Sequence, residues 1–450
     1  MNNNTEGMSR RRFIQTASSA ALLAGIGLPK VTGFAAEDTG FRNLIDPSKK
    51  LRIASIGAGG QALVDLNLMA TEEIVALCDV DYARAAKGFA TWPNAARYRD
   101  YRQMFREMAD QIDGVLIATP DHTHFPAAMM ALEYGKHIYV EKPLTHTIGE
   151  ARLLREAARK ARVVTQMGNH GHANETTRLV KEWIEGGVIG PVRRVHFWTN
   201  RPVWPQGLNL PTGQQSVPSQ LDWNLWQGVA PERPYDRAYL PFAWRGWWDY
   251  GCGAFGDMGC HVMDAAFWSL NLRGPFKVSA ESEGNNQVCA PRWAVVRYDF
   301  PQRGEMPPCQ LSWFEGGVLP PKPKELGDAD MPKQGVLYYG DKGVIMTIGD
   351  YSDSPRLLPE SAMKAFRERP PKSIPRVPGG NARMEWVNAC KGGPKPGSDI
   401  VDYSAALTEF ILAGNLAIRM GRELHYDPAT GTCVGEPDAD RLINKTYRTF

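Results

Sequence analysis

Apolar runs alternate with helical patterns over the first third of the chain. Five largely apolar runs bounded by turn residues predict buried strands: 51–56, 74–78, 110–118, 137–140 and 163–167. Residues 127–134 and 147–162 carry apolar side chains at the spacing of one helical face. Strands that alternate with helices predict a parallel sheet built from βαβ units. We therefore expect residues 51–170 to form one α/β domain.

The pattern changes from about residue 175. A linking helix over 175–185 ends at Gly186-Gly187, and the strands that follow are joined by short turns with no helices between them. The predicted strands are 192–198, 276–280, 293–300, 310–314, 336–339 and 344–348. Such runs indicate a largely antiparallel open sheet, so residues 171–450 are expected to form an α+β domain. Its C-terminal helices, within 384–419, are in a position to pack back on the first domain.

The N-terminus has the layout of an export signal. Arg10, Arg11 and Arg12 precede an apolar run, 17–28, that is too short to span a bilayer, and small residues follow at 33–36. This resembles a twin-arginine (Tat) signal over residues 1–35, with a linker over 36–50. It predicts a periplasmic or secreted protein that meets the Tat export machinery and has no stable membrane anchor. A disordered basic tail beside a buried helix is the alternative.

Charge and cysteine content exclude several classes. The first 35 residues hold four of the 52 basic residues and one of the 49 acidic residues, which leaves 48 of each in the remainder. A nucleic-acid surface needs clustered excess Lys and Arg, so no nucleic-acid partner is expected. The seven cysteines are scattered without C-x-x-C spacing, which argues against a disulfide framework or a structural zinc site.

A glycine-rich turn follows the first predicted strand. Gly57 permits a tight turn, Gly59 lacks a side chain that would hold a pyrophosphate away, and Ala62 allows close helix packing. Asp79 ends the second strand at about the spacing of a carboxylate that binds ribose hydroxyls. The set predicts a Rossmann domain that binds NAD rather than NADP, because a carboxylate repels a 2′-phosphate.

One further motif carries acid–base groups. Asp257 and His261 lie four residues apart, which on a helix places them on one face. There the carboxylate can orient the imidazole while His261 exchanges the proton of an alcohol. An Asp helix cap beside a satisfied buried histidine is the structural alternative. A third interpretation makes them metal ligands together with His122, His124, His170 or His172, but no H-E-x-x-H pattern occurs and no metal site is expected.

In chain order, Gly57-x-Gly59, Asp79, Glu141-Lys142-Pro143 and Gly256 to His261 resemble the glucose-fructose oxidoreductase and inositol dehydrogenase family, written Gfo/Idh/MocA. The resemblance covers nearly all of the chain beyond the leader. It implies a Rossmann domain, an α/β domain whose open sheet supports homo-oligomers, and a nicotinamide cofactor that acts on a sugar or polyol. It also places the catalytic lysine at Lys142 and puts the turn 119–124 at the ribose or nicotinamide.

The candidate residues fall into three sets. The catalytic set is Lys142, Asp257 and His261. The expected cofactor contacts are Gly57, Gly59, Gly60, Gln61, Asp79, Thr119, Pro120, His122, His124, Glu141 and Lys142. The expected substrate contacts are Asn169, His170, Trp223, Trp226, Arg245, Trp248, Tyr250, Asp257 and His261.

An insertion at 199–275 has the most unusual composition in the chain and supplies most of the candidate substrate contacts. Seven of the 13 tryptophans fall within the 51 residues 198–248, beside several arginines and tyrosines. Flat aromatic faces next to planar donors suit a pyranose, which has an apolar C–H face and hydroxyl edges. Core packing is expected to use about half of these side chains.

Three functions remain open from the sequence. The first is hydride transfer between a nicotinamide and a hydroxyl carbon of a sugar, a polyol or a keto-sugar derivative. The second is an NAD-dependent glycoside hydrolase or lyase that oxidises its substrate transiently and eliminates the aglycone. The third is a carbohydrate-binding protein that has lost the reaction. Because free NAD is not expected outside the cytoplasm, an exported enzyme is expected to hold its cofactor tightly.

Overall fold

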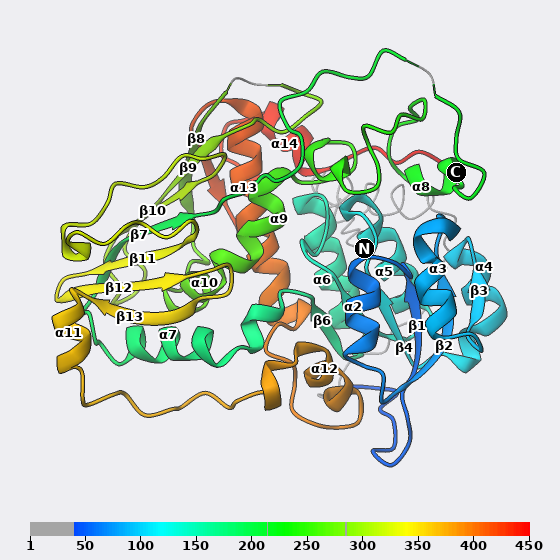
Figure 1. Ribbon diagram of the computed structural model, residues 1–450, viewed down its shortest axis with the longest axis horizontal. Coiled ribbons are helices and arrows are strands. Elements are labelled where there is room, and N and C mark those ends of the chain that lie inside the picture. Colours follow the sequence, from blue (N-terminus) through cyan, green and yellow to red (C-terminus); the bar gives the residue numbers. More distant parts are fainter. Residues whose placement is uncertain (1–39, 214, 284–285) are drawn as a thin grey trace, which may run out of the picture.

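The computed structural model describes residues 40–213, 215–283 and 286–450, which contain two β-sheets separated by helices (Figure 1). The predicted export signal lies outside the described residues. Within the described part of the chain, no helix is long and apolar enough to cross a bilayer.

The first sheet is parallel and doubly wound, with the order β3-β2-β1-β4-β5-β6. Its strands are β1 (Arg52–Ile56), β2 (Glu73–Cys78), β3 (Ala96–Tyr98), β4 (Gly114–Ile117), β5 (His137–Val140) and β6 (Thr165–Met167). This order confirms the Rossmann fold. The strand order reverses at β1 and β4, where open α/β sheets bind ligands beyond the carboxyl ends of their strands.

Helices cover both faces of this sheet. They are α2 (Gln61–Asn67), α3 (Tyr82–Thr91), α4 (Tyr101–Met108), α5 (His124–Glu133) and α6 (Ile148–Ala161), with 3-10 turns η1 (Ala109–Gln111), η2 (Asp121–Thr123) and η3 (His170–Ala173). A capping box starts α6, since Thr147 accepts from Glu150 N and the Glu150 side chain accepts from Thr147 N. The cap fixes the start of α6 and so one end of the segment between β5 and α6, which contains Lys142.

The second sheet has nine strands in the order β13-β12-β11-β7-β10-β9-β8-β14-β15. They are β7 (Val192–Trp198), β8 (Phe276–Ser282), β9 (Ala294–Phe300), β10 (Cys309–Phe314), β11 (Gly335–Gly340), β12 (Gly343–Ile348), β13 (Asp353–Leu358), β14 (Leu424–Asp427) and β15 (Thr432–Cys433). Only β7 and β10 pair in parallel among these described strands. The predicted, largely antiparallel sheet is therefore confirmed.

The remaining helices are α7 (Glu175–Glu185), α8 (Trp223–Gln227), α9 (Gly253–Val262), α10 (Asp264–Ser269), α11 (Glu360–Ala365), α12 (Ala382–Cys390), α13 (Ala405–Met420) and α14 (Pro437–Ile443), with the turns η4 (Ala243–Gly246), η5 (Lys324–Leu326), η6 (Pro378–Gly380) and η7 (Ile400–Ser404). Figure 1 shows α9 and α13 between the two sheets. Because α13 contacts α6 as well as β8 and β9, the C-terminal helices join the two domains.

The insertion lies against the Rossmann domain. Asp81 forms a β-bridge with Leu221, and Tyr82 N donates to Gln220 O at 3.1 Å. An apolar cluster holds the insertion together and includes Trp223, Trp226 and Tyr250. The insertion therefore covers the carboxyl ends of β1 and β2.

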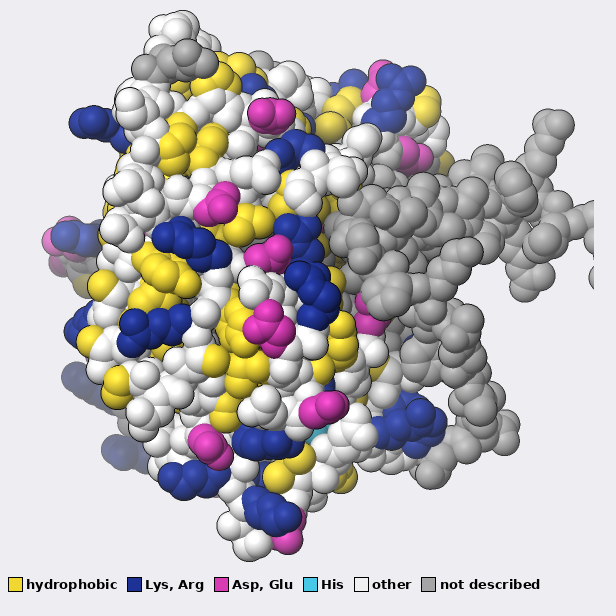
Figure 2. All heavy atoms as spheres, turned by 90° about the vertical axis from the view of Figure 1, so that its right-hand side faces the viewer, with side chains coloured by type: hydrophobic (Ala, Val, Ile, Leu, Met, Phe, Trp, Pro, Cys, Tyr) yellow, Lys and Arg dark blue, Asp and Glu magenta, His cyan; other side chains and the backbone are white. Residues whose placement is uncertain are grey.

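Figure 2 shows the face of the molecule that lies on the right in Figure 1. Basic and acidic side chains are interspersed over this face, with apolar side chains between them. This mixture matches the balanced composition of residues 36–450.

Candidate active site

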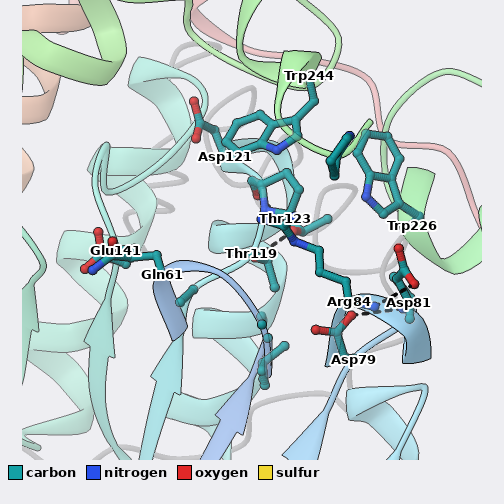
Figure 3. A pocket seen from close by; sticks show the side chains of 18 of the residues that line it. Gln61, Asp79, Asp81, Arg84, Thr119, Asp121, Thr123, Glu141, Trp226 and Trp244 are labelled. Atoms are coloured by element: carbon teal, nitrogen blue, oxygen red, sulfur yellow. Dashed lines mark hydrogen bonds between the residues drawn. The ribbon is translucent and has the colours of Figure 1, made fainter. Parts of the chain in front are cut away.

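A cleft runs along the carboxyl ends of the Rossmann strands and under the insertion (Figure 3). Its lining includes Gly57, Gly59, Gln61, Asp79, Thr119, Pro120, Asp121, Glu141, Lys142, Trp226, Trp244, Arg245 and Asp257. Candidates from both domains therefore share one cavity, although up to about 200 residues separate them in the sequence.

The glycine turn is needed for packing as well as for access. Gly57 has φ 99°, and a Cβ there would lie 2.5 Å from Ala118 O. A Cβ on Gly59 would lie 2.5 Å from the backbone oxygen of Arg84, at the start of α3. The sequence predicts that Gly59 lets a pyrophosphate approach, and in the structure its missing side chain also makes room for α3.

Asp79 closes the cleft beside this turn. Its two carboxylate oxygens accept from Ala58 N and Asp81 N, both at 2.9 Å, and burial raises its pKa. In Figure 3 the Arg84 side chain extends from α3 across the cleft near Asp79. A glycine turn and a neighbouring carboxylate that line the same cleft fit a dinucleotide, whose phosphates and ribose hydroxyls such groups bind.

In the turn between β4 and α5, some of the candidate residues line the cleft and others are buried in the structure. Thr119 and Pro120 line the cleft as expected. His122 and His124 are buried instead: the His122 ring contacts Tyr250 O and Trp226 O, and the His124 ring contacts Pro143 O and Thr119 O. Burial lowers the pKa of His122 to about 3 and that of His124 to about 4. These neutral rings anchor the turn and the insertion rather than line the cleft.

Lys142 and Asp257 form the central contact of the site. Lys142 Nζ lies 2.9 Å from Asp257 Oδ1, and Arg245 Nε lies 3.3 Å from the same oxygen. Burial acts to raise the pKa of Asp257, but the two cations hold it below its ordinary value. Burial likewise acts to lower the pKa of Lys142, and Asp257 holds it above its ordinary value. Both groups are therefore charged at neutral pH.

This pairing corrects the expected partner of Asp257. We expected its carboxylate to orient His261, but its contacts are with Lys142 and Arg245, and His261 Nδ1 is buried with no hydrogen-bond partner among the described residues. The His261 ring lies instead beside His170, with ring centroids 5.2 Å apart, and beside Tyr351 at 5.1 Å. Burial, then Lys142, holds the pKa of His261 well below its ordinary value. The imidazole is therefore neutral at physiological pH, and its lowered pKa makes it a weaker base than a free histidine.

Two more side chains next to this centre have a buried polar atom without a hydrogen-bond partner among the described residues. Asn169 Oδ1 accepts from Ser398 at 2.5 Å, whereas its Nδ2 has no partner within the described chain. His170 Nδ1 also lacks one, and burial lowers the pKa of His170 to about 4. Polar atoms left unpaired at a functional site are available to a polar ligand such as a polyol.

Glu141 is held beneath the cleft by a charge network. Arg383 on α12 lies 2.5 Å from Asp65 Oδ1 and 3.8 Å from Glu141 Oε1. Burial, followed by the charge of Asp65, raises the pKa of Glu141 to about 8. The second domain therefore helps to hold Glu141, a carboxyl whose pKa is raised, at the wall of the cleft.

The candidate substrate contacts from the insertion, which are mostly aromatic, lie in three different parts of the structure. Trp226 and Arg245 line the cleft. Trp223 stacks on Trp226 at 4.8 Å and Tyr250 is fully buried beside both, so these two pack the insertion rather than face the cleft. Trp248 lines a different cavity.

Three of the histidines considered as metal ligands, His122, His124 and His172, have hydrogen-bonding partners of other kinds. His172 Nδ1 contacts both Asp264 oxygens at 3.1 Å, with both residues buried. Over the described residues, no three His, Cys, Asp or Glu side chains gather as a metal site requires.

Sequence reasoning missed four residues near the reacting groups. Asp121 lines the cleft, and burial, then Asp257, raises its pKa to about 7. Tyr351 contacts both His170 and His261, and Asp350 next to it lies 3.6 Å from Arg201. Asp121 lies within the turn 119–124, of which only Thr119, Pro120, His122 and His124 were predicted to contact the cofactor. The other three lie in loops of the second sheet without a motif.

Two family models match the chain. Residues 51–169 match "Oxidoreductase family, NAD-binding Rossmann fold", and residues 175–306 match "Oxidoreductase family, C-terminal alpha/beta domain", both of the GFO_IDH_MocA group. Together they cover more than half of the chain and include all the catalytic candidates.

Curated relatives and solved structures agree with this match. D-glucoside 3-dehydrogenase of Escherichia coli is 32% identical over 239 residues, which are 52% of this chain and 58% of that protein. The chain spans about half the length of the curated relatives that it matches.

Among solved structures, the WlbA dehydrogenase from Bordetella pertussis, in complex with NADH and UDP-GlcNAcA, is similar with a TM-score of 0.59 and 17% identity, over 83% of this chain and 98% of that one. An inositol dehydrogenase homolog from Azotobacter vinelandii, complexed with NADH and myo-inositol, has a TM-score of 0.56 and 17% identity, over 86% and 100%. At such identities these two structures establish the fold.

Proposed function

The chain belongs to the Gfo/Idh/MocA family of NAD-binding oxidoreductases, and on that premise we propose that it transfers hydride between a tightly bound nicotinamide and a hydroxyl carbon of a sugar, polyol or keto-sugar derivative. The observation that carries this proposal is the Lys142–Asp257 contact, which lies in the same cleft as the glycine turn and one helical turn from His261.

Lys142 serves the reacting oxygen. NAD, when bound, supplies the hydride acceptor or donor. The Lys142 ammonium donates a hydrogen bond to the substrate oxygen and stabilises the alkoxide charge that develops there. Asp257 keeps this ammonium charged and positioned, since it accepts from Lys142 Nζ at 2.9 Å. Arg245 shares the same carboxylate, so the three side chains together carry one net positive charge.

His261 is the proposed proton acceptor in the oxidation direction. It is neutral at physiological pH because burial and the Lys142 charge disfavour the imidazolium. Because Lys142 stabilises the alkoxide, the substrate hydroxyl becomes more acidic, and a weakly basic His261 can accept its proton. Asn169 and His170, with their unpaired atoms, are the proposed contacts of the remaining substrate hydroxyls.

A variant of the base tests this assignment. We expect His261→Ala to lower turnover about 10²- to 10⁴-fold, the usual contribution of general-base catalysis, with NAD still bound. The measurement is single-turnover absorbance of the reduced nicotinamide. His196→Ala is the matched control, because His196 is another buried histidine with an unpaired Nδ1 and lies on β7. Equal loss in both variants, or no loss in His261→Ala, removes the base assignment.

The name of one relative favours a glycoside as substrate and keeps the second candidate function open. That relative is called D-glucoside 3-dehydrogenase. A ketone formed on a glycoside acidifies the neighbouring C–H, so elimination of the aglycone can follow before the ketone is reduced again. Release of an aglycone from aryl glycosides without net NADH accumulation would favour this cycle. NADH that accumulates with the sugar product would favour a dehydrogenase, and no absorbance change with any sugar would favour a carbohydrate-binding protein.

The leader and the open sheet support two further proposals. Tat export to the periplasm or beyond is supported by the arginines and apolar run in residues 1–35. Fusion of residues 1–39 to a reporter, with and without Arg11→Lys and Arg12→Lys, tests it in cells that have or lack the Tat system.

The nine-stranded sheet supports a homo-oligomer, which analytical ultracentrifugation tests.

A further inference from the structure

A second cavity lies next to the insertion, outside the cleft. The segment that supplies Trp244 and Arg245 to the cleft continues through 248–252 into the wall of this cavity. Its other walls come from the start of α6, from α13 and from the chain after α14. Its volume is about 260 Å³, room for roughly nine waters at about 30 Å³ each and therefore for a molecule of monosaccharide size.

The cavity contains a cation without a carboxylate partner. Arg419 on α13 forms no ion pair with any described residue, and its Nε is buried without a hydrogen bond. Its guanidinium lies 5.4 Å from the centre of the Trp248 ring. The acid on the same wall, Asp249, is already paired with Arg233. A half-buried guanidinium with unused donors is a binding group for an anion, and its planar shape favours a carboxylate.

A free acceptor lies on the same face of α13. Asn415 is one turn before Arg419, is only 6% exposed, and donates through Nδ2 to Cys252 O at 2.8 Å. That bond fixes the orientation of the amide, which leaves Oδ1 buried without a donor among the described residues. An occupant that satisfies both side chains must carry a hydrogen-bond donor close to its negative group.

The remaining walls narrow the class of occupant. Trp248, Leu412 and Leu416 provide an apolar side suited to C–H groups. Lys445 Nζ forms an ion pair with Glu150 at 2.8 Å, so Arg419 is the cation in this lining that remains without an ion pair. The negative charge of Asp249 on the same wall disfavours a multiply charged anion. We propose that this cavity binds a small hydroxycarboxylate of sugar-acid size, whose carboxylate pairs with Arg419 and whose hydroxyl donates to Asn415.

Calorimetric titration of the full chain with D-gluconate tests the proposal. Binding should be lost with D-glucose, which has a similar carbon skeleton but no carboxylate. Arg419→Gln should weaken gluconate binding about tenfold or more, the usual effect of losing a hydrogen bond to a charged group, and Arg419→Lys should weaken it less. Arg441→Gln is the matched control, since Arg441 is exposed on α14 and paired with Asp438. It should leave the affinity unchanged.

A variant of the cleft separates this site from the proposed active site. Lys142→Met should leave gluconate binding intact, because Lys142 does not line the second cavity. Gluconate affinity that falls in Lys142→Met and not in Arg419→Gln would place the ligand in the cleft and overturn the proposal. So would the absence of binding to the wild-type protein at millimolar gluconate. A melting temperature for each variant shows that a lost affinity is not a lost fold.

Discussion

Asp257 illustrates what residue spacing can and cannot establish. Its distance of four positions from His261 correctly places both residues on one helix, α9. Spacing says nothing about which neighbour a buried carboxylate will contact. In the fold two cations from other elements come within 3.3 Å of it, and a charge pair in a poorly solvated site outweighs a contact with a neutral ring. The acid therefore serves Lys142 rather than His261.

Loss of the Lys142 ammonium should affect the rate more than the fold. We expect Lys142→Met to lower turnover about 10²- to 10³-fold, as removal of one donor to a developing oxyanion does. Asp257 keeps Arg245 as a partner, so the protein should still fold. Single-turnover rates with excess sugar measure the effect.

Lys391→Met is a closely matched control for Lys142→Met. Lys391 also pairs with a buried carboxylate, Glu72, at 2.8 Å, and its side chain is 17% exposed against 14% for Lys142. It does not line the cleft. Equal rate losses in the two variants would mean that Lys142 acts only through stability.

Glu315 offers a test of stability against pH. It is 1% exposed, accepts from Trp313 Nε1 at 2.9 Å, and burial raises its pKa from 4.5 to about 8. Because the folded pKa is the higher one, the stabilising contribution of the protonated form is complete below about pH 4.5 and is lost as pH rises through 8. Each pH unit in that window costs about 1.4 kcal/mol.

Glu315→Gln should remove this dependence. Its melting temperature relative to the wild type should rise between pH 5 and pH 9, in thermal unfolding followed by circular dichroism. Glu281→Gln is the control, since Glu281 is an exposed residue of β8 paired with Arg297. A parallel pH profile for Glu315→Gln and the wild type would show that Glu315 is ionised in the folded protein.

At the scale of elements, segments with a strong apolar pattern were predictable and strands at or next to the sheet edges were not. The ends of β5, α7 and β7 match the predicted ranges, because each has a strong apolar pattern and clear boundary residues. The edge strands β3, β13 and β15 and the neighbouring β14 were missed, since they lack a clear apolar pattern and depend on a partner strand for their hydrogen bonds. The helical region 384–419 divides into α12, η7 and α13 around Gly392 and Pro394.

The β2–α3 junction should determine which nucleotide is used. Asp79 disfavours a 2′-phosphate, while Arg84 and Arg99 line the same part of the cleft. We expect Asp79→Ser to raise the ratio of kcat/KM for NADP over NAD about tenfold or more, because the repulsion is removed and two cations remain. Steady-state rates with apo protein and added nucleotide measure the ratio. Asp81→Asn, which keeps the cap of α3, is the control. An equal rise there would contradict a specific role for Asp79.

At the scale of the whole molecule, the site depends on contacts that no local pattern encodes. Arg383 reaches from α12 to Asp65 and Glu141, and Tyr351 comes from the loop after β12 to meet His261. The sequence predicted the Lys142, Asp257 and glycine-turn components because each belongs to a motif. It could not predict Arg383 or Tyr351, whose positions follow from how the second domain packs on the first.

If the protein is exported through the Tat system, as proposed, it crosses the membrane already folded and with its cofactor bound. Because free NAD is not expected outside the cytoplasm, the dinucleotide should remain with the purified protein through dialysis. We expect about one nucleotide per chain after heat release, and a lower melting temperature once it is stripped, since a ligand that binds only the folded state stabilises it.

Two glycine variants make this expectation specific to the cleft. Gly59→Ala should release the nucleotide on dialysis, because its Cβ would lie 2.5 Å from Arg84 O and must displace the turn. Gly274→Ala, where a Cβ would meet nothing within 4 Å, should keep it. A wild-type protein that loses its nucleotide on simple dialysis would contradict a resident cofactor. The cycle would then require nicotinamide from outside, which an exported enzyme does not have, so either the export signal or the redox reaction would have to be given up.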